Sequence, residues 1–384
     1  MRPTFVLGRI AGIRIGVHWS VLLVFAVIVL GLAQGRLPQA YPGHVWPVYW
    51  SVGFLAAVVF FASLLAHELA HAILARRGGI EVDDIVLWLL GGAARLKTEA
   101  PNPATELRIA AVGPLVSLVL GGLFALAAWL LDTASAPGPA VEALAWLAAI
   151  NILLAVFNVI PAAPLDGGRL LRAFLWWRTG DRLRATAGAT AAGRAFGWFL
   201  TVVGLLLFAR GDVAGGLWLV MVGWFLATAA TVEGQQAQLR GVLAGVPVRQ
   251  AMTADPVTVP AGLTIAGFLA GPRYRYRHSA FPVTGGDSAP VGLMTLDLAD
   301  RVPEDRRDAV TVEQVMVPLS RVVVVGPDDP LADLLPRVQP GAEHRVLVLE
   351  EDRLAGIVSA SDVSRTVTWL MTTTPRRRGG GRGA

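Results

Sequence analysis

The chain has 384 residues, of which 54% are hydrophobic and only 16% are charged, and its formal net charge is +5. A soluble domain usually carries about a quarter charged residues, so this composition excludes a protein that is soluble along its whole length. The chain contains no cysteine. Disulfides, cysteine nucleophiles and cysteine-ligated metals are therefore excluded, and any metal must be bound by His, Asp or Glu.

The charged residues are unevenly distributed along the chain. Residues 1–248 contain 17 basic and 12 acidic side chains, whereas residues 249–384 contain 16 of each in about half that length. This pattern predicts a polytopic α-helical membrane domain followed by a smaller soluble domain. The positive excess lies in the membrane part, where it indicates loop orientation, and we expect no nucleic-acid partner.

Six apolar segments follow one another in the first part. Most of them reach the roughly 20 residues that are needed to cross a bilayer, although the fifth is short. Basic residues gather before the first segment, after the second and between the fourth and fifth, which predicts a multi-pass protein of the cell membrane with a cytoplasmic N-terminus and soluble domain. The segments are residues 17–33, 48–75, 107–131, 140–160, 195–209 and 213–231.

The second apolar segment contains the run His67-Glu68-Leu69-Ala70-His71. On a helix, two histidines four residues apart lie on one face and suit a shared metal ion, with Glu68 beside them to accept a proton from a metal-activated water. Three ionisable groups in an apolar span cost several kcal/mol unless they have a function, so a chance match is a poor explanation. If Arg76 marks the interface, the metal would lie about 13 Å inside the membrane.

A third ligand is expected from another apolar setting, because catalytic zinc normally has three protein ligands. The fourth segment ends in a run from Asn158 to Arg169 that contains two prolines, the carboxylate of Asp166 and two glycines. Alone, Asp166 before Gly-Gly would be an ordinary turn residue. Together with His67 and His71, it is the best candidate for the missing ligand, and two imidazoles with one carboxylate suit zinc.

These two motifs, in this order, resemble those of the site-2 proteases, a family of intramembrane zinc metalloproteases. The resemblance implies a zinc ion bound by His67, His71 and Asp166. It also implies Glu68 as general base and acid, and Asn158 as a polar group that holds the substrate or stabilises the oxyanion. The expected reaction is hydrolysis of peptide bonds in membrane-tethered proteins, such as regulators of the sigma and anti-sigma type.

Further segments fit the same family. Residues 88–96 resemble its re-entrant β-hairpin, whose edge pairs with an unwound substrate strand, and Gly113-Pro114 resembles a point of close helix packing. The role of His18, either an interfacial residue or part of the site, stays open. The resemblance implies substrate contacts from Leu89, Leu90, Gly91, Gly92 and Pro164.

The soluble part contains a tandem repeat. Residues 251–259 recur at 315–325, residues 281–283 at 346–348 and residues 291–295 at 355–359, with offsets of 64 to 66 residues. Such regularity indicates two copies of one α/β unit. The units resemble a pair of CBS domains, which implies binding of ATP or a related adenine nucleotide, with Ser359 and Asp362 as the ribose contacts. In the first repeat Asp297 follows Thr295 by two residues, which departs from that pattern. A purely structural CBS pair, used for dimerisation or docking, is the other interpretation.

We therefore expect five segments. They are a transmembrane zinc metalloprotease domain (1–234), a linker (235–247), two CBS repeats (248–307 and 308–371) and a disordered Arg/Gly-rich tail (372–384). The subgroup with a C-terminal CBS pair, the type that processes sporulation pro-sigma factors, combines these parts, and nucleotide would then gate proteolysis. The alternative hypothesis is a CBS-regulated ion transporter that uses the same intramembrane His and Asp residues.

Overall fold

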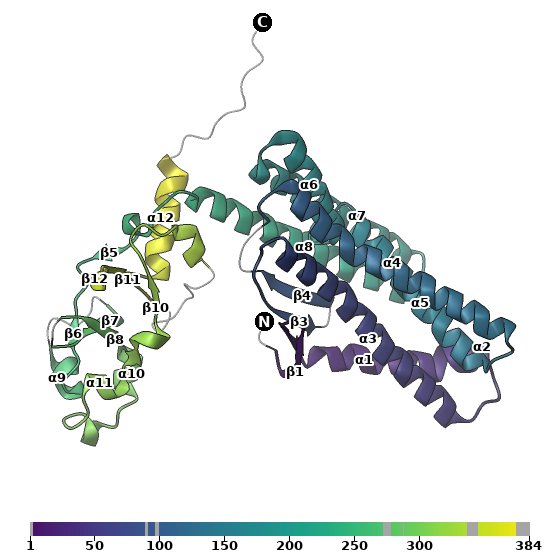
Figure 1. Ribbon diagram of the computed structural model, residues 1–384, viewed down its shortest axis with the longest axis horizontal. Coiled ribbons are helices and arrows are strands. Elements are labelled where there is room, and N and C mark those ends of the chain that lie inside the picture. The colour runs from purple at the N-terminus through teal and green to yellow at the C-terminus, as the bar shows by residue number, and fades with distance from the viewer. Residues whose placement is uncertain are drawn as a thin grey trace, which may run out of the picture. The chain divides into compact units, whose positions relative to one another are not determined.

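The computed structural model describes residues 3–88, 91–96, 100–271, 278–286, 288–335 and 345–373. The chain divides into two compact units, Met1–Gln235 and Gln236–Ala384. The first unit is mainly helical and the second contains two small sheets (Figure 1).

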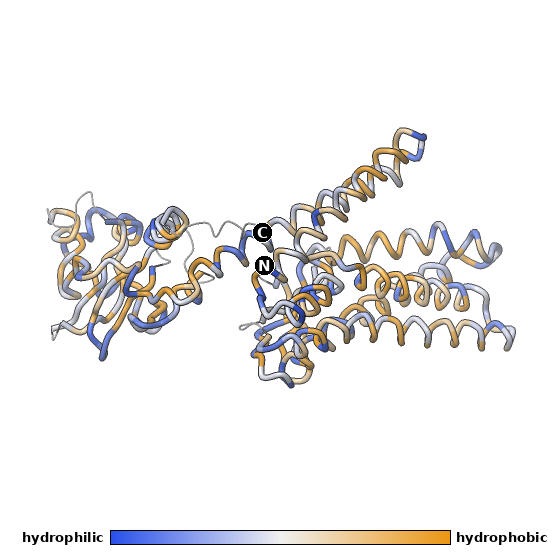
Figure 2. Tube along the Cα trace, turned by 90° about the horizontal axis from the view of Figure 1, so that it is seen from above, coloured by the Kyte–Doolittle hydropathy of each residue, from blue (hydrophilic) through white to orange (hydrophobic). Residues whose placement is uncertain are grey.

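Six helical segments among the described residues are long and apolar enough to cross a membrane. Hydrophobic residues run along most of the length of the long helices (Figure 2). The first span, Ser20–Ala40, combines α1 (Ser20–Leu30), a π-helical turn (Gly31–Arg36) and α2 (Leu37–Ala40). The others are α3 (Trp46–Arg77), α4 (Pro103–Thr133), α5 (Gly138–Val159), α7 (Arg182–Ala209) and α8 (Val213–Leu243).

The fifth span is longer than its apolar segment suggested. Arginines, threonines and glycines lower the hydropathy of its first half without ending the helix, and α7 therefore begins at Arg182. Gly197 and Gly204 lie so close to the backbone of α8 that a Cβ at either position would clash. Small residues permit such close approach between membrane helices.

A four-stranded sheet lies beside α3 in the order β1 (Phe5–Ile10), β2 (Ile13–Val17), β3 (Val82–Trp88) and β4 (Gly91–Leu96) (Figure 1). The β3–β4 pair is antiparallel and corresponds to the expected re-entrant hairpin. The β1–β2 hairpin, which joins it through a parallel β2–β3 pairing, was not expected. Ile13 and Ile85 of the sheet pack with Leu64 and Ala72 of α3 in one buried cluster, which positions β4 against that helix.

The chain between α5 and the short helix α6 (Asp166–Thr179) is packed tightly. A Cβ on Gly168 would meet the backbone of Ala162 and Ala163, and one on Gly193 of α7 would meet Ala163. Both glycines therefore allow close contact between this loop and its neighbours, which positions the first turn of α6.

The second unit confirms the tandem repeat and adds an exchange of strands between the repeats. One sheet has the order β6-β7-β8-β9 and the other the order β10-β11-β12-β5, so each repeat receives a short strand from its partner. Gly292 pairs with Pro318, and Gly356 pairs with Ala254, which repeats the pairing at an offset of 64 residues. The strands are β5 (Thr253–Ala254), β6 (Val259–Pro260), β7 (Ala280–Thr284), β8 (Pro290–Thr295), β9 (Val317–Pro318), β10 (Val323–Val325), β11 (Val346–Glu350) and β12 (Arg353–Val358).

The helices of the second unit are short, apart from the last one. The first repeat contains α9 (Ile265–Ala270) and α10 (Leu296–Asp300), and α11 (Val312–Val315) opens the second. The second repeat has a 3-10 turn, Leu331–Leu334, where the first has α9, and it ends in α12 (Ala360–Thr373). The expected tail from residue 374 onward lies outside the described residues, and residues 235–243 of the expected linker continue α8.

Candidate metal centre

His67 and His71 lie one turn apart on α3 and both are buried. Their Nε2 atoms are 3.2 Å apart. The i, i+4 spacing brings the two rings onto one face of the helix, as the sequence motif predicts.

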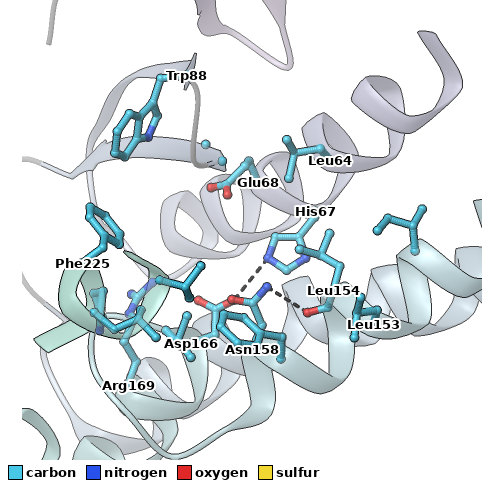
Figure 3. A pocket seen from close by; sticks show the side chains of 18 of the residues that line it. Leu64, His67, Glu68, Trp88, Leu153, Leu154, Asn158, Asp166, Arg169 and Phe225 are labelled. Atoms are coloured by element: carbon cyan, nitrogen blue, oxygen red, sulfur yellow. Dashed lines mark hydrogen bonds and ion pairs between the residues drawn. The ribbon is translucent and has the colours of Figure 1, made fainter. Parts of the chain in front are cut away.

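Asp166 is the first residue of α6, and its carboxylate lies against both histidines. Its Oδ2 atom is 3.2 Å from Nε2 of His67 and 3.1 Å from Nε2 of His71 (Figure 3 shows the His67 contact). One ligand atom of each residue lies within 4.8 Å of the other two, which is close enough for all three to bind one metal ion. The structure therefore unites residues that are almost one hundred positions apart in the chain.

Burial and hydrogen bonding act in opposite directions on the Asp166 carboxyl. Burial raises its pKa, but the hydrogen bonds with His67 and His71 outweigh this effect, and the pKa is held well below its ordinary value. The N-terminus of α6 also favours a negative charge at this position. Asp166 is therefore anionic at neutral pH, as a metal ligand must be.

Two residues of α4 orient the histidine rings from behind. His71 donates from Nδ1 to the carbonyl oxygen of Ile109 over 2.6 Å, and Nδ1 of His67 lies 2.9 Å from Oγ of Ser117. Partners of this kind set the tautomer of a metal-binding histidine and leave Nε2 free for the ion. The sequence interpretation missed both, although they lie four residues on either side of Gly113 and thus share its helix face.

Gly113 leaves the space that a metal ion would need. A Cβ at this position would lie 2.6 Å from Nε2 of His67 and closer still to Nε2 of His71. Any larger residue would therefore occupy space directly against both Nε2 atoms. Two imidazoles, one carboxylate and this open space fit a zinc ion.

Glu68 faces the same cavity but is not one of the converging ligands (Figure 3). Its carboxylate lies against β4, because a Cβ on Gly92 would be only 2.8 Å from its Oε1 atom. Because glycine has no side chain, it permits this close approach of the β4 backbone to the Glu68 side chain.

The cavity beside these residues has a volume of about 920 Å³. Asn158, Pro164, Gly91 and Gly92 line it. The catalytic role of Asn158 and the substrate contacts of the other three stay predictions. Asn158 donates one amide hydrogen to the carbonyl of Leu154, 3.0 Å away (Figure 3). Leu89 and Leu90 lie outside the described residues.

The sequence interpretation also missed part of the cavity wall. Arg169 lies one turn after Asp166, and an apolar face of α8 contributes several further lining residues: Trp218, Met221, Val222 and Phe225. His18 is not among the described residues that line this cavity. It forms a 2.9 Å hydrogen bond with Ser20 at the start of α1, which favours its interfacial interpretation.

Ser359 and Asp362, the expected ribose contacts, meet at the start of α12. Oδ2 of Asp362 accepts hydrogen bonds from the backbone nitrogen of Ser359, at 2.9 Å, and from its hydroxyl. Arg365 forms an ion pair with the other carboxylate oxygen. At the matching place in the first repeat, Thr295 accepts from the backbone nitrogen of Leu298. The geometry thus joins the two expected residues and agrees with the departure in repeat one.

Comparisons with known proteins agree with this geometry. Residues 55–133 and 132–202 match Peptidase family M50, and residues 312–368 match the CBS domain. The chain is 42% identical over 368 residues to the Mycobacterium tuberculosis protein named zinc metalloprotease Rip3, covering 96% of this chain and 93% of that protein. The chain belongs to peptidase family M50, the site-2 proteases.

More distant relatives carry the same description. A Synechocystis protein named zinc metalloprotease sll0528 is 31% identical, with 89% of each chain covered, and zinc metalloprotease MJ0392 of Methanocaldococcus jannaschii is 28% identical, covering 94% of this chain and 95% of that one. The solved site-2 protease from Methanocaldococcus jannaschii aligns with a TM-score of 0.41 at 28% identity, over 60% of this chain and 94% of that chain.

This family member is a multi-pass membrane zinc metallopeptidase with a CBS domain. The predictions of family, fold class and enzyme class are confirmed. Membership of a peptidase family also favours proteolysis over the alternative of an ion transporter.

Proposed function

We propose that this metallopeptidase hydrolyses peptide bonds of membrane-tethered proteins in the cavity beside α3. His67, His71 and Asp166 hold the zinc ion, and Glu68 is the general base. The observation that carries this proposal is the approach of Asp166 Oδ2 to both Nε2 atoms, within 3.2 Å, around the space left by Gly113.

Each residue has a separate chemical task in this proposal. Zinc bound at this point supplies a Lewis acid that polarises the scissile carbonyl and lowers the pKa of water. Glu68 accepts the proton of the attacking water and delivers it to the amide nitrogen of the leaving product. Asn158 has one amide hydrogen bonded to Leu154 and one that remains for a carbonyl oxygen of the substrate.

The substrate must be extended to reach this site, because a helix hides its peptide bonds. We assign β4 as the strand that pairs with it, with Gly91 and Gly92 at the end that lines the cavity. Main-chain pairing at a sheet edge provides affinity without demanding a particular sequence. Apolar walls from α5 and α8 suit the side chains of a membrane segment.

We place both termini and the CBS unit in the cytoplasm. Arg76 and Arg77 end α3, and a second group of arginines lies between α5 and α7, whereas few basic residues lie at the opposite helix ends. ATP or a related adenine nucleotide, bound near Ser359 and Asp362, would then gate the peptidase from the cytoplasmic side.

The proposal is tested with full-length protein in detergent and a single-span protein substrate. Glu68→Gln is expected to keep one zinc ion per chain and to lose cleavage. Glu304→Gln, an exposed glutamate of the other unit, is the matched control and should cleave like the wild type. Unchanged cleavage by Glu68→Gln would remove Glu68 from the mechanism.

A further inference from the structure

Arg172 of α6 lies between two carboxylates that belong to two other helices. Its Nε donates to Oε1 of Glu106 on α4 over 2.6 Å, and Nη2 contacts the same oxygen. Its Nη1 donates to Oε1 of Glu233 on α8 over 3.1 Å. One guanidinium therefore joins three helices, and we refer to Glu106, Arg172 and Glu233 as the arginine clamp.

The two arms of the arginine clamp differ in burial. The side chain of Glu106 is 1% exposed and that of Glu233 is 32% exposed, with Arg172 between them at 16%. The second carboxylate oxygen of Glu106 has no hydrogen-bond partner among the described residues. A buried carboxylate is costly unless a charge compensates it, so Arg172 must stay beside Glu106 for this part of the protein to be stable.

The arginine clamp connects α6, which carries Asp166, to α4, which carries the hydrogen-bond partners of the two histidines. Ile109 and Ser117, which orient the histidines, belong to the same helix as Glu106. Asp166 lies six residues before Arg172, or about 9 Å along α6. Fixing Arg172 against Glu106 therefore fixes the axial position of Asp166 relative to both histidines.

Metal ligation is sensitive to such displacements, because ligand distances must be held within a few tenths of an ångström. Asp166 lies at the start of a short helix, α6, of 14 residues. The loop before it supports one end of this helix, and the arginine clamp supports the middle.

We propose that Arg172 is a positioning residue for the metal centre, which acts through α6 on Asp166. This inference rests on the proposed function of Asp166 as a zinc ligand. The buried Glu106 arm holds α6 in place, and the more exposed Glu233 arm adds a second attachment.

The test compares full-length variants in detergent by zinc affinity, by the absorption spectrum of the cobalt(II)-substituted protein and by kcat and KM. Arg172→Gln is expected to weaken zinc binding about 10- to 100-fold, to change the cobalt spectrum and to lower kcat with little change in KM. Arg172→Lys should restore part of the zinc affinity, the cobalt spectrum and kcat. Glu233→Gln should change the same three quantities in the direction of Arg172→Gln, but less. Arg178→Gln, an exposed arginine later in α6, is the matched control.

Should Arg172→Gln fail to fold, the double variant Glu106→Gln with Arg172→Gln removes the uncompensated charge and takes its place. A fold-stabilising role alone predicts a lower Tm with zinc affinity, cobalt spectrum and kcat all unchanged, and this result would overturn the inference. The proposed function fails separately, if the wild type binds zinc at Asp166 but cleaves no peptide bond.

Discussion

The α-carbon of Gly113 on α4 faces the imidazole of His71 so closely that a single methyl group at position 113 would occupy the space between Nε2 of His71 and Nε2 of His67. The missing side chain at position 113 thus leaves room for an ion beside the two histidines. The same helix, α4, supplies their hydrogen-bond partners Ile109 and Ser117. The packing of α4 against α3 therefore provides both the space for the ion and the orientation of the histidine rings.

Gly113→Ala should lose zinc while the protein stays folded. The new methyl group competes with the ion, whereas alanine itself favours a helix over glycine by roughly 1 kcal/mol. Gly122→Ala, on the same helix but facing open space, is the matched control. Zinc per chain, measured by mass spectrometry after gel filtration, should fall well below one for Gly113→Ala and remain at one for the control. Equal zinc content in the two variants would show that the ion lies elsewhere.

Gly92→Ala should separate catalysis from metal binding. A methyl group on β4 would push the Glu68 carboxylate away, because the three atoms nearest to it all belong to Glu68 and none to the converging ligands. We expect full zinc content with a loss of cleavage of about 100-fold or more, the range that removal of a general base produces. Gly262→Ala, in an open position of the second unit, provides the control for the assay. Wild-type kcat in Gly92→Ala would place the base outside this contact.

The sequence predicts the ligands better than it predicts what supports them. His67, His71 and Asp166 stand out because ionisable groups in apolar segments are rare and costly. Ile109 and Ser117 do not stand out, because a membrane helix is apolar on every side and its hydropathy does not reveal which face is turned inward. The same reason hides the cavity-lining face of α8.

The four-stranded sheet of the first unit was predicted only in part. The β3–β4 hairpin could be expected from the family resemblance, whereas β1 has six exposed residues and lacks the alternation that identifies a half-buried strand. In the second unit the nearly constant offset of 64 to 66 residues predicted the repeat. The exchange of β5 and β9 between the sheets could not be read from it, because a strand's partner depends on tertiary packing rather than on local pattern.

Ser117→Ala should weaken zinc binding without removing a ligand. The substitution leaves Nδ1 of His67 without its partner at 2.9 Å, and losing such a partner typically costs about 10- to 100-fold in metal affinity. Ser63→Ala is the control, since Ser63 is also buried on a membrane helix but donates to its own helix at Val59. Competition with a chromogenic zinc chelator measures both. The same affinity in Ser117→Ala and wild type would mean that Ser117 does not orient the histidine.

Nucleotide binding should occur once per chain and should depend on Asp362. This carboxylate is buried at the start of α12 and bonded to Ser359, whereas the first repeat has Leu298 at the matching position. Calorimetric titration of the full-length protein with ATP at millimolar concentration should give a stoichiometry of one, and Asp362→Asn should weaken binding about tenfold, the loss expected for a charge-assisted hydrogen bond. Asp297→Asn, an exposed aspartate of the first repeat, should bind like the wild type. No heat from the wild type would leave the CBS pair with a structural role, and equal weakening by both variants would place the nucleotide between the repeats rather than at the second one.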